Sequence, residues 1–244
     1  HTNNWGDKVI AHLQDPKTGI IGVAGGDFVP RVPASWGTLI SPGNNVIQSD
    51  SSGKKTTHQF SIPKDYSSAT RSSIILDGLF LSMRSDMTHK IRFDENLKGF
   101  HGYDYDISLQ SITAGYKNYV IYDVKVEHFS RGGTNILYFR NLILVYKKWE
   151  EYLPLIGENM TDEECKSIPK IEIVKLLQLT KKMVRKGFET SEIRTAVAYY
   201  GNLIGYKPAT MFFSFRVFLI KIFNSPKYLL KKNRIISQQK SEVK

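Results

Sequence analysis

The hydrophobic and polar positions near the start of the chain follow first a helical and then a strand pattern. Residues 5–13 have the spacing of an amphipathic helix, and residues 20–24 form a short apolar run that ends at a glycine pair. An apolar run of this length, bounded by turn residues, is typical of a buried strand. A helix followed directly by such a strand predicts α/β architecture.

The composition and pattern of residues 30–91 predict a long loop and then further strands. Residues 30–66 are rich in proline, glycine, serine and asparagine, which predicts a long loop with an edge hairpin. Residues 73–83 are apolar except where Asp77-Gly78 interrupts them, and this pattern predicts a strand with a bulge or bend. A short helical turn is expected over residues 85–91.

A second helix and strand follow. Helical spacing runs from about Tyr105 to Ala114 and stops at Gly115, after which residues 119–122 have the pattern of a strand. In this helix, Tyr105 and Leu109 begin a stripe of positions that predicts one buried face.

From residue 136 onwards the pattern is helical. The predicted helices are 136–153, 171–186 and 191–204. Thr161 begins a Thr-x-x-Glu pattern with Glu164, which predicts a capped helix start. The sequence therefore predicts two parts, which are residues 1–135 with α/β character and a helical extension over residues 136–244.

Charge changes the interpretation of the last segment. The chain has a net charge of +11, and residues 221–244 contain seven basic residues and one acidic residue. Residues 211–223 are the most apolar segment but are too short and too charged to span a bilayer. An interfacial helix with a basic tail predicts docking on an anionic membrane surface, and a core helix with a solvated tail is the alternative. Nucleic acid is not an expected partner, because the basic residues lie beside an apolar helix and not among stacking aromatics.

Cysteine usage bears on the compartment. Cys165 is the one cysteine, which excludes an internal disulfide framework and predicts a reducing, cytoplasmic location. Together with the basic tail, this predicts a peripheral position at the inner face of the plasma membrane. The chain begins at His1 without a signal-like stretch, and we expect it to be a fragment of something longer.

The chemistry is concentrated at the start of the second predicted helix. On a helix that begins at Asp104, the side chains of Asp104 and Asp106 lie about 200° apart, so they cannot both ligate one ion without distortion and should have different roles. A carboxylate at a helix N-terminus is stabilised as an anion and can act as a general base. The alternative is that these aspartates only cap the helix. His128 ends the strand pattern after this helix, so we expect it to return to the same end of a sheet as Asp104. It is either a divalent-metal ligand or a hydrogen-bonded structural histidine.

Several spaced motifs carry a resemblance to a known family. The stretches LDGLFLSMRSD, IRFDENLKGFHGYDYDISLQSITAGY and VEHFS resemble the acceptor-side half of a GT-A-type, family-two-like glycosyltransferase. Upstream, GDKVIAHLQDPKTGIIGVAGG and PRVPASWG also resemble the bacterial glycosyltransferase-like group that is linked to capsule and other surface glycans. The resemblance covers about residues 1–135 and implies a partial GT-A (Rossmann-like) domain.

The resemblance also implies roles for individual residues. Asp104 matches the base that deprotonates the acceptor hydroxyl, and His128 matches a histidine that completes a divalent-metal site for Mn²⁺ or Mg²⁺. Asp106 matches a second acidic position, with a capping or acceptor-contact role. The implied substrate-binding residues are Asp77, Gly78, His101 and Asp106.

The D-x-D spacing of Asp104 and Asp106 is not the family's metal and diphosphate motif. In the family that motif closes a strand of the nucleotide-binding half, which we expect to lie upstream of His1, so this fragment alone is expected to be inactive. The resemblance implies an inverting transfer of a sugar from a nucleotide-sugar donor to a hydroxyl of a glycan or lipid-linked acceptor in bacterial surface polysaccharide synthesis. A non-catalytic glycan- or partner-binding module on a degenerate transferase fold, and a metal-dependent hydrolase, are the alternatives.

Overall fold

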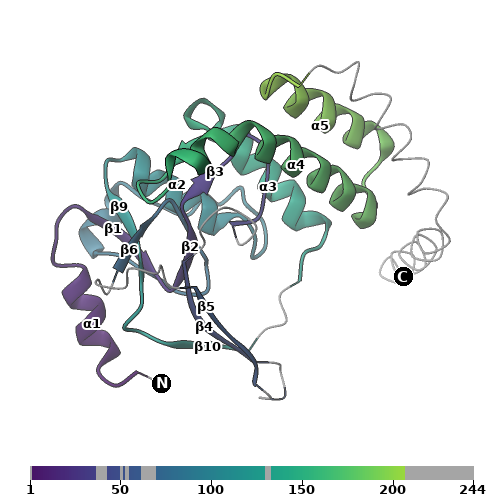
Figure 1. The fold of residues 1–244 in the computed structure, drawn as a ribbon. Coiled ribbons are helices and arrows are strands. Elements are labelled where there is room, and N and C mark those ends of the chain that lie inside the picture. Colours follow the sequence, from purple (N-terminus) through teal and green to yellow (C-terminus); the bar gives the residue numbers. More distant parts are fainter. Residues whose placement is uncertain are drawn as a thin grey trace. The chain divides into compact units, whose positions relative to one another are not determined.

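The chain divides into two compact units. The computed structural model describes residues 2–36, 43–49, 52, 55–61, 70–129 and 133–206, with the backbone only for residues 55–61. One unit spans His1–Ile168 and the other Pro169–Lys244, so the division falls within helix α4 (Asp162–Lys186) (Figure 1). Helix α3 (Ile136–Lys148) therefore packs inside the first unit, whereas the predicted domain division at residue 135 stays a prediction.

The first unit contains a four-stranded sheet in which a parallel pair lies at the centre. Its order is β6 (Thr70–Ser73), β9 (Lys117–Ile121), β1 (Thr18–Gly22) and β8 (Leu81–Ser82). Strands β1 and β9 are parallel, and both outer strands are antiparallel to their neighbours. A parallel central pair with helical connections is typical of α/β folds.

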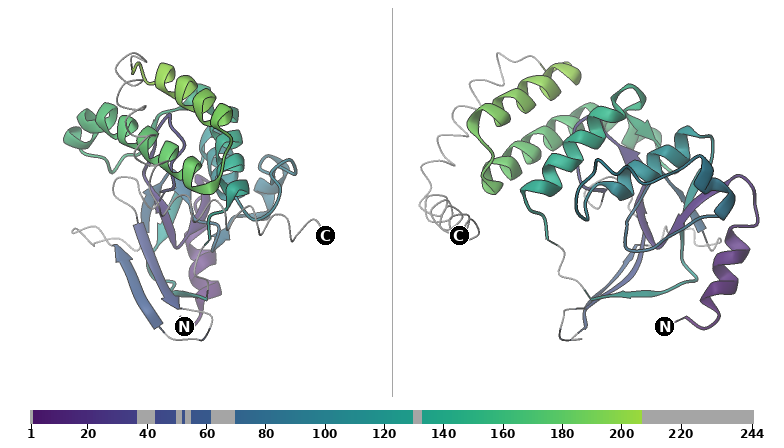
Figure 2. Two further views of the ribbon diagram at one scale, coloured as in Figure 1. Left: turned by 90° about the vertical axis from the view of Figure 1, so that its right-hand side faces the viewer. Right: turned by 180° about the vertical axis from the view of Figure 1, so that it is seen from behind.

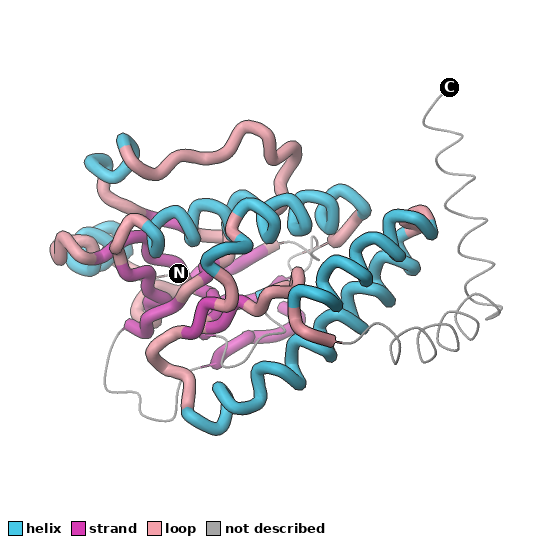
Figure 3. The backbone as a smooth tube through the Cα atoms, turned by 90° about the horizontal axis from the view of Figure 1, so that it is seen from above, coloured by secondary structure: helices cyan, strands magenta, loops and turns pink. Residues whose placement is uncertain are grey.

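A second sheet carries the predicted hairpin. Its order is β10 (Val126–His128), β4 (Gly43–Ser49), β2 (Ala24–Gly26) and β7 (Ile75–Leu76), and β5 (Lys55–Ser61) pairs with β4. Strands β4 and β5 form the hairpin that the composition of residues 30–66 predicts. A separate short pair joins β3 (Phe28–Val29) to β11 (Leu155–Ile156). All of these strands belong to the first unit, while α4 and α5 (Thr190–Leu203) continue as helices (Figure 3).

The chain passes from one sheet to the other at two adjacent places. Strand β1 leads into β2 through Val23, and β6 leads into β7 through Ile74. The expectation of one bent strand over residues 73–83 was wrong in one respect, because β7 and β8 pair in different sheets. The turn at Asp77-Gly78 turns the chain back, so that Leu81 pairs with β1 of the first sheet.

The helices confirm most of the periodicity. Helix α1 is Trp5–His12, α2 is Tyr103–Thr113, and short 3₁₀ turns cover Ser85–His89 and Glu150–Tyr152. The predicted capping box is present, since Thr161 N–H donates to Glu164 at 2.8 Å and Glu164 N–H donates back to the Thr161 hydroxyl at 3.3 Å. Helix α4 accordingly begins nine residues earlier than the apolar spacing alone predicts. Among the described residues, no helix is long and apolar enough to cross a membrane. The predicted interfacial helix at residues 211–223 and its basic tail lie outside the described residues.

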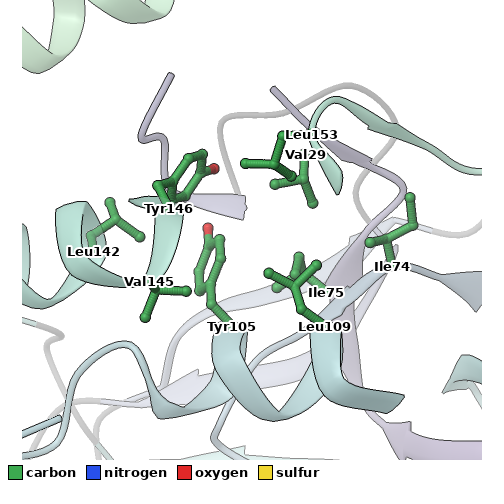
Figure 4. Close-up of a cluster of buried hydrophobic side chains, with 9 residues drawn as sticks. All are labelled: Val29, Ile74, Ile75, Tyr105, Leu109, Leu142, Val145, Tyr146 and Leu153. Atoms are coloured by element: carbon green, nitrogen blue, oxygen red, sulfur yellow. The ribbon is translucent and has the colours of Figure 1, made fainter. Parts of the chain in front are cut away.

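The core that supports α2 is shared with α3. Tyr105 and Leu109 of α2, both nearly fully buried, confirm the predicted stripe and pack against Leu142, Val145 and Tyr146 of α3 (Figure 4). The two tyrosine hydroxyls point to the same region, where both donate to the Ala34 carbonyl, at 2.8 Å from Tyr105 and 3.3 Å from Tyr146. The loop after β3 is thereby attached to both helices.

One buried asparagine connects α2 with the strands. The Asn118 side chain accepts from Ile20 N–H at 3.1 Å and donates to the carbonyls of Ile74 at 3.2 Å and Ser108 at 3.0 Å. The Ser108 hydroxyl in turn accepts from Leu76 N–H at 3.1 Å. These bonds hold the middle of α2 against β7, which places the first turn of α2 beside the residues that follow β7.

Candidate active site

The loop before α2 requires glycine for its shape. Gly99 and Gly102 have φ values of 75° and 86°, in the left-handed region that side chains disfavour. Gly102 occupies the N-cap position, so neither aspartate caps the helix with its side chain. Asp104 and Asp106 lie in the first turn instead, where the helix dipole and free N–H groups favour negative charge.

The carboxylate of Asp104 faces the turn that follows β7. Its Oδ2 accepts from Gly78 N–H at 3.4 Å, and its Oδ1 accepts from Tyr105 N–H at 3.0 Å. The Tyr103 hydroxyl donates to the Gly78 carbonyl at 3.0 Å. Two consecutive residues of α2 therefore hold the two sides of Gly78.

Asp77 is held on the other side of the same turn. Its Oδ2 accepts from the indole N–H of Trp36 at 2.8 Å, and its Oδ1 accepts from Leu79 N–H at 2.9 Å. Asp77 N–H donates to the Ala24 carbonyl at 2.8 Å, which anchors the turn to β2. The structure thus brings Asp77, Gly78 and Asp104 together.

The surroundings of Asp104 raise its affinity for a proton. Burial is the largest cause and the charge of Asp77 the second, and together they raise the pKa of Asp104 from 3.8 to about 6 in spite of the hydrogen bonds from Tyr105 and Gly78. The side chain is still half-buried and not sealed from solvent. A carboxyl group in this state is ionised at neutral pH and yet binds a proton readily.

Aromatic side chains surround the two carboxylates. Tyr138 of α3 shares a hydrogen bond of 2.9 Å with the Ser35 hydroxyl, and its ring meets that of His101 edge to face at 5.3 Å between centroids. Burial, and then the charges of Asp104 and Asp77, raise the pKa of both Tyr138 and Tyr103. These tyrosines are therefore neutral hydroxyl donors at physiological pH. His101 is held beside them through its ring.

Asp106 has a structural role, which corrects the predicted substrate contact. Its side chain is 0% exposed, and its Oδ1 accepts from the Trp149 indole N–H and the Lys148 ammonium, both at 2.8 Å. Its Oδ2 accepts from Gln110 at 2.7 Å. Because both oxygens are bound by the protein's own groups, Asp106 joins α2 to the end of α3 and does not face a substrate.

His128 lies far from Asp104 along the second sheet. His128 pairs with Gln48 of β4. Four residues earlier on β4, Asn44 pairs with Ala24 of β2. The Ala24 carbonyl accepts from Asp77 N–H. Four residues of strand span about 13 Å, and β2 and β10 follow one another along the same edge of β4, opposite β5. Figures 1 and 2 show β10 with the β4–β5 hairpin, away from α2. The expectation that His128 returns to the same place as Asp104 was wrong, because β10 pairs with the far end of β4, beyond the residues that pair with β2.

The sequence comparisons identify the family. The sequence profile of the glycosyltransferase-like family matches residues 1–131, slightly more than half of the chain. The chain belongs to this glycosyltransferase-like family. The match contains Trp36, Asp77, Gly78, Tyr103 and Asp104, whereas Tyr138 lies beyond it. Among curated proteins, none matches the sequence significantly.

Membership of the glycosyltransferase-like family agrees with the architecture. The mixed α/β fold is that of a partial GT-A (Rossmann-like) domain, followed by a helical C-terminal part. The fold class predicted from the sequence is therefore confirmed.

A divalent cation is common in GT-A glycosyltransferases, but the described residues do not form a site for one. No group of three or more histidine, cysteine, aspartate or glutamate side chains with suitable geometry occurs in the described part of the chain. His128 Nδ1 lies 3.2 Å from the Gln48 side-chain oxygen, and both carboxylate oxygens of Asp77 are engaged by the protein. The described residues therefore do not fit a complete metal centre.

Three residues of this corner were not selected from the sequence. These are Trp36, which contacts Asp77, and Tyr103, which contacts Gly78. The third is Tyr138, which contacts Ser35 and His101. Tyr103 adjoins Asp104 and was the most accessible to sequence reasoning, whereas Trp36 and Tyr138 reach the corner from distant segments. No local pattern around Tyr138 distinguishes it from the other apolar positions of α3.

Proposed function

We propose that this chain contributes the acceptor side of a glycosyltransferase and that Asp104 is its general base. The reaction is the transfer of a sugar from a nucleotide-sugar donor to a hydroxyl of a glycan or lipid-linked acceptor. Family membership supports glycosyl transfer in general. The observation that carries the assignment of Asp104 is its half-buried carboxylate at the start of α2, with a pKa raised to about 6.

This proton affinity suits a base that works near neutral pH. With a pKa of about 6, the ionised form of Asp104 outnumbers the protonated form by about ten to one at pH 7. An ordinary aspartate is ionised as well but is a weaker base by about two pK units, and catalytic bases work best with a pKa near the operating pH. The proposed Asp104 therefore combines availability with basicity.

The proposed step is a single displacement. The acceptor oxygen attacks the anomeric carbon, its proton passes to Asp104, and the bond between that carbon and the diphosphate oxygen breaks, with the electron pair leaving on the diphosphate. Attack opposite the leaving group inverts the anomeric configuration. Trp36, Tyr103 and Tyr138 suit a sugar acceptor, since such sites combine aromatic surface with a few polar groups that fix orientation.

The proposed donor, metal ion and membrane contact involve residues outside the corner. The donor and a divalent cation, Mn²⁺ or Mg²⁺, belong to the proposed reaction as a whole, with His128 as a single candidate ligand. Synthesis of a bacterial capsule or another surface polysaccharide, at the inner face of the plasma membrane, is proposed for the full-length protein. Sedimentation with anionic liposomes tests the membrane part, and binding that does not change when residues 211–244 are deleted would contradict it.

The function is tested with the full-length protein and a panel of donors. UDP-glucose, UDP-galactose, UDP-N-acetylglucosamine and GDP-mannose are incubated with candidate glycans, and release of the nucleoside diphosphate is measured. Asp104→Asn is expected to lower turnover by about 10²- to 10⁴-fold, the usual contribution of a general base, while donor affinity is unchanged.

The matched control is Asp86→Asn, which makes the same chemical change at a side chain that is 68% exposed. It should leave turnover unchanged. Near-normal turnover by Asp104→Asn would remove Asp104 from the base role. Glycan binding without consumption of any donor would favour the non-catalytic binding module.

A further inference from the structure

Two carboxylates hold the turn that follows β7, Asp104 through Gly78 N–H and Asp77 through Leu79 N–H. The peptide group that joins Asp77 to Gly78 carries the N–H that donates to Asp104 Oδ2. Asp77 is itself fixed by Trp36 and by Leu79 N–H. A series of hydrogen bonds therefore runs from Trp36 through the turn after β7 to the first turn of α2.

We propose that Asp77 is a positioning residue for Asp104, held by the Trp36 indole so that it closes the Gly78 turn against α2 and keeps its negative charge beside the Asp104 carboxylate. The catalytic meaning of this arrangement rests on the proposed base role of Asp104. The effect of Asp77 on Asp104 does not, because it is a property of the protein without substrate.

The geometry gives Asp77 two effects on Asp104. Through the Oδ1 bond to Leu79 N–H, Asp77 closes the turn that directs Gly78 N–H toward Asp104. Through its charge, it opposes a second negative charge nearby, because two close carboxylates do not both ionise freely. Neutralising Asp77 should therefore make Asp104 a weaker base.

Among the described residues, the charge of Asp104 acts on three tyrosines. Tyr103 and Tyr105 lie on α2 itself and Tyr138 on α3, and burial is the first cause that raises the pKa of each. All three stay neutral around pH 6, where Asp104 titrates. A change in the titration of Asp104 near this pH can therefore be assigned to Asp77 and not to these neighbours.

The hydrogen bond from the Trp36 indole acts on the charged form of Asp77 as well as on its position. The indole N–H donates to an Asp77 oxygen, and a hydrogen bond to the charged form of a carboxylate favours that form. With this bond, the negative charge of Asp77 is held beside Asp104. Without it, that charge is held less firmly and has a weaker effect on Asp104, so the step seen at Asp104 would move to lower pH.

The experiment is a pH titration of aspartate carboxyl carbons by ¹³C NMR on the full chain, without substrate. Asp104 should titrate near pH 6 in the unmodified protein. In Asp77→Asn its midpoint should fall toward the ordinary value of 3.8 but stay above it, because burial remains and is the larger cause. An unchanged midpoint in a folded Asp77→Asn protein overturns the proposal.

A milder variant tests the part played by Trp36. Trp36→Phe keeps an aromatic ring but removes the N–H, and the Asp104 midpoint should move in the same direction by a smaller amount. If the midpoint stays in place, Trp36 does not set the proton affinity of Asp104. Asp86→Asn is the matched control for loss of one exposed negative charge, and its Asp104 midpoint should equal that of the unmodified protein.

A measurement on the unmodified chain keeps the proposal testable if Asp77→Asn does not fold. Protonation of Asp104 changes the electric field at a carboxylate held beside it, so the Asp77 carboxyl resonance should shift as Asp104 titrates near pH 6. An Asp77 resonance with no change there contradicts the interaction between the two carboxylates. Because none of these readouts needs a donor or acceptor, failure of this interaction is distinct from failure of the proposed glycosyl transfer.

Discussion

The ring of Tyr103 occupies the space that a side chain at Gly78 would need. The Tyr103 hydroxyl donates to the Gly78 carbonyl at 3.0 Å, and a Cβ added to Gly78 would overlap the same hydroxyl and the ring carbons beside it. The requirement for glycine here is one of space and not of backbone angle, since Gly78 does not lie in the left-handed region. Tyr103 and Gly78 are thus matched to each other.

The first prediction follows from this match. Gly78→Ala should destabilise the fold by about 1–3 kcal/mol, the usual range for overpacking. In the background of Tyr103→Ala the same change should have much less effect, because the overlapping ring is gone. Urea unfolding of the two single variants and the double variant measures the coupling, which should be about 1 kcal/mol or more.

Gly6→Ala is the control for this cycle. Gly6 lies in α1 with nothing within 4 Å of an added Cβ, so alanine there should be neutral or stabilising. Additive effects of Gly78→Ala and Tyr103→Ala would show that the ring is not what excludes a side chain at position 78.

The second prediction concerns the pH dependence of stability. The pKa of Asp104 in the folded protein is about 6, above its ordinary 3.8, so the folded state binds the extra proton between these values. Ionised Asp104 therefore disfavours the folded state above pH 6, and this unfavourable effect is relieved as the pH falls through 6 toward 4. Asp104→Asn should gain stability relative to the unmodified chain at pH 7.5, and the gain should shrink at pH 4.5. Denaturant unfolding at both pH values checks this, and a difference that does not vary with pH would contradict the raised pKa.

The third prediction concerns the buried carboxylate of Asp106. The Lys148 ammonium bridges Asp106 at 2.8 Å and Asp94 at 2.7 Å, and its hydrogen bond is the first cause that lowers the pKa of Asp94 to about 2. Lys148→Met should destabilise the first unit by about 2 kcal/mol, below the usual range for a broken buried ion pair because the Lys148 side chain is 41% exposed.

Lys117→Met is a suitable comparison, measured by the same thermal or denaturant unfolding. The Lys117–Glu158 pair is at 2.9 Å but more than half exposed on both sides, so its loss should change stability much less than the loss of Lys148. Equal effects of the two variants would argue against a special role for the buried Asp106.

The fourth prediction concerns Asn118, which is fully buried and bonds to Ile20, Ile74 and Ser108. Asn118→Ala would leave one N–H and two carbonyls without their partner, and the expected destabilisation is about 3 kcal/mol or more. Asn96→Ala, at an exposed residue, should change stability by about 0.5 kcal/mol at most. Hydrogen exchange at Ile20 N–H offers a second readout, and an unchanged exchange rate would mean that Asn118 does not protect it.

Much of the local structure was accessible from the sequence. The periodicity of α1 and α2, the capping box at Thr161 and the hairpin within residues 30–66 depend on a few neighbouring residues, and all were found. The pairing of β7 and β8 was not, because strands of two residues have no pattern that distinguishes the sheet in which they lie.

The sequence alone established that Asp104 and Asp106 have different roles, because residues two positions apart on a helix point about 200° away from each other. Which role each has follows from tertiary contacts. Asp106 is buried because Lys148 and Trp149 from the end of α3 reach it, while Asp104 meets Gly78 because Asn118 holds α2 against β7. His128 was misplaced for the same reason, since sheet order depends on pairings between distant segments that no local spacing encodes.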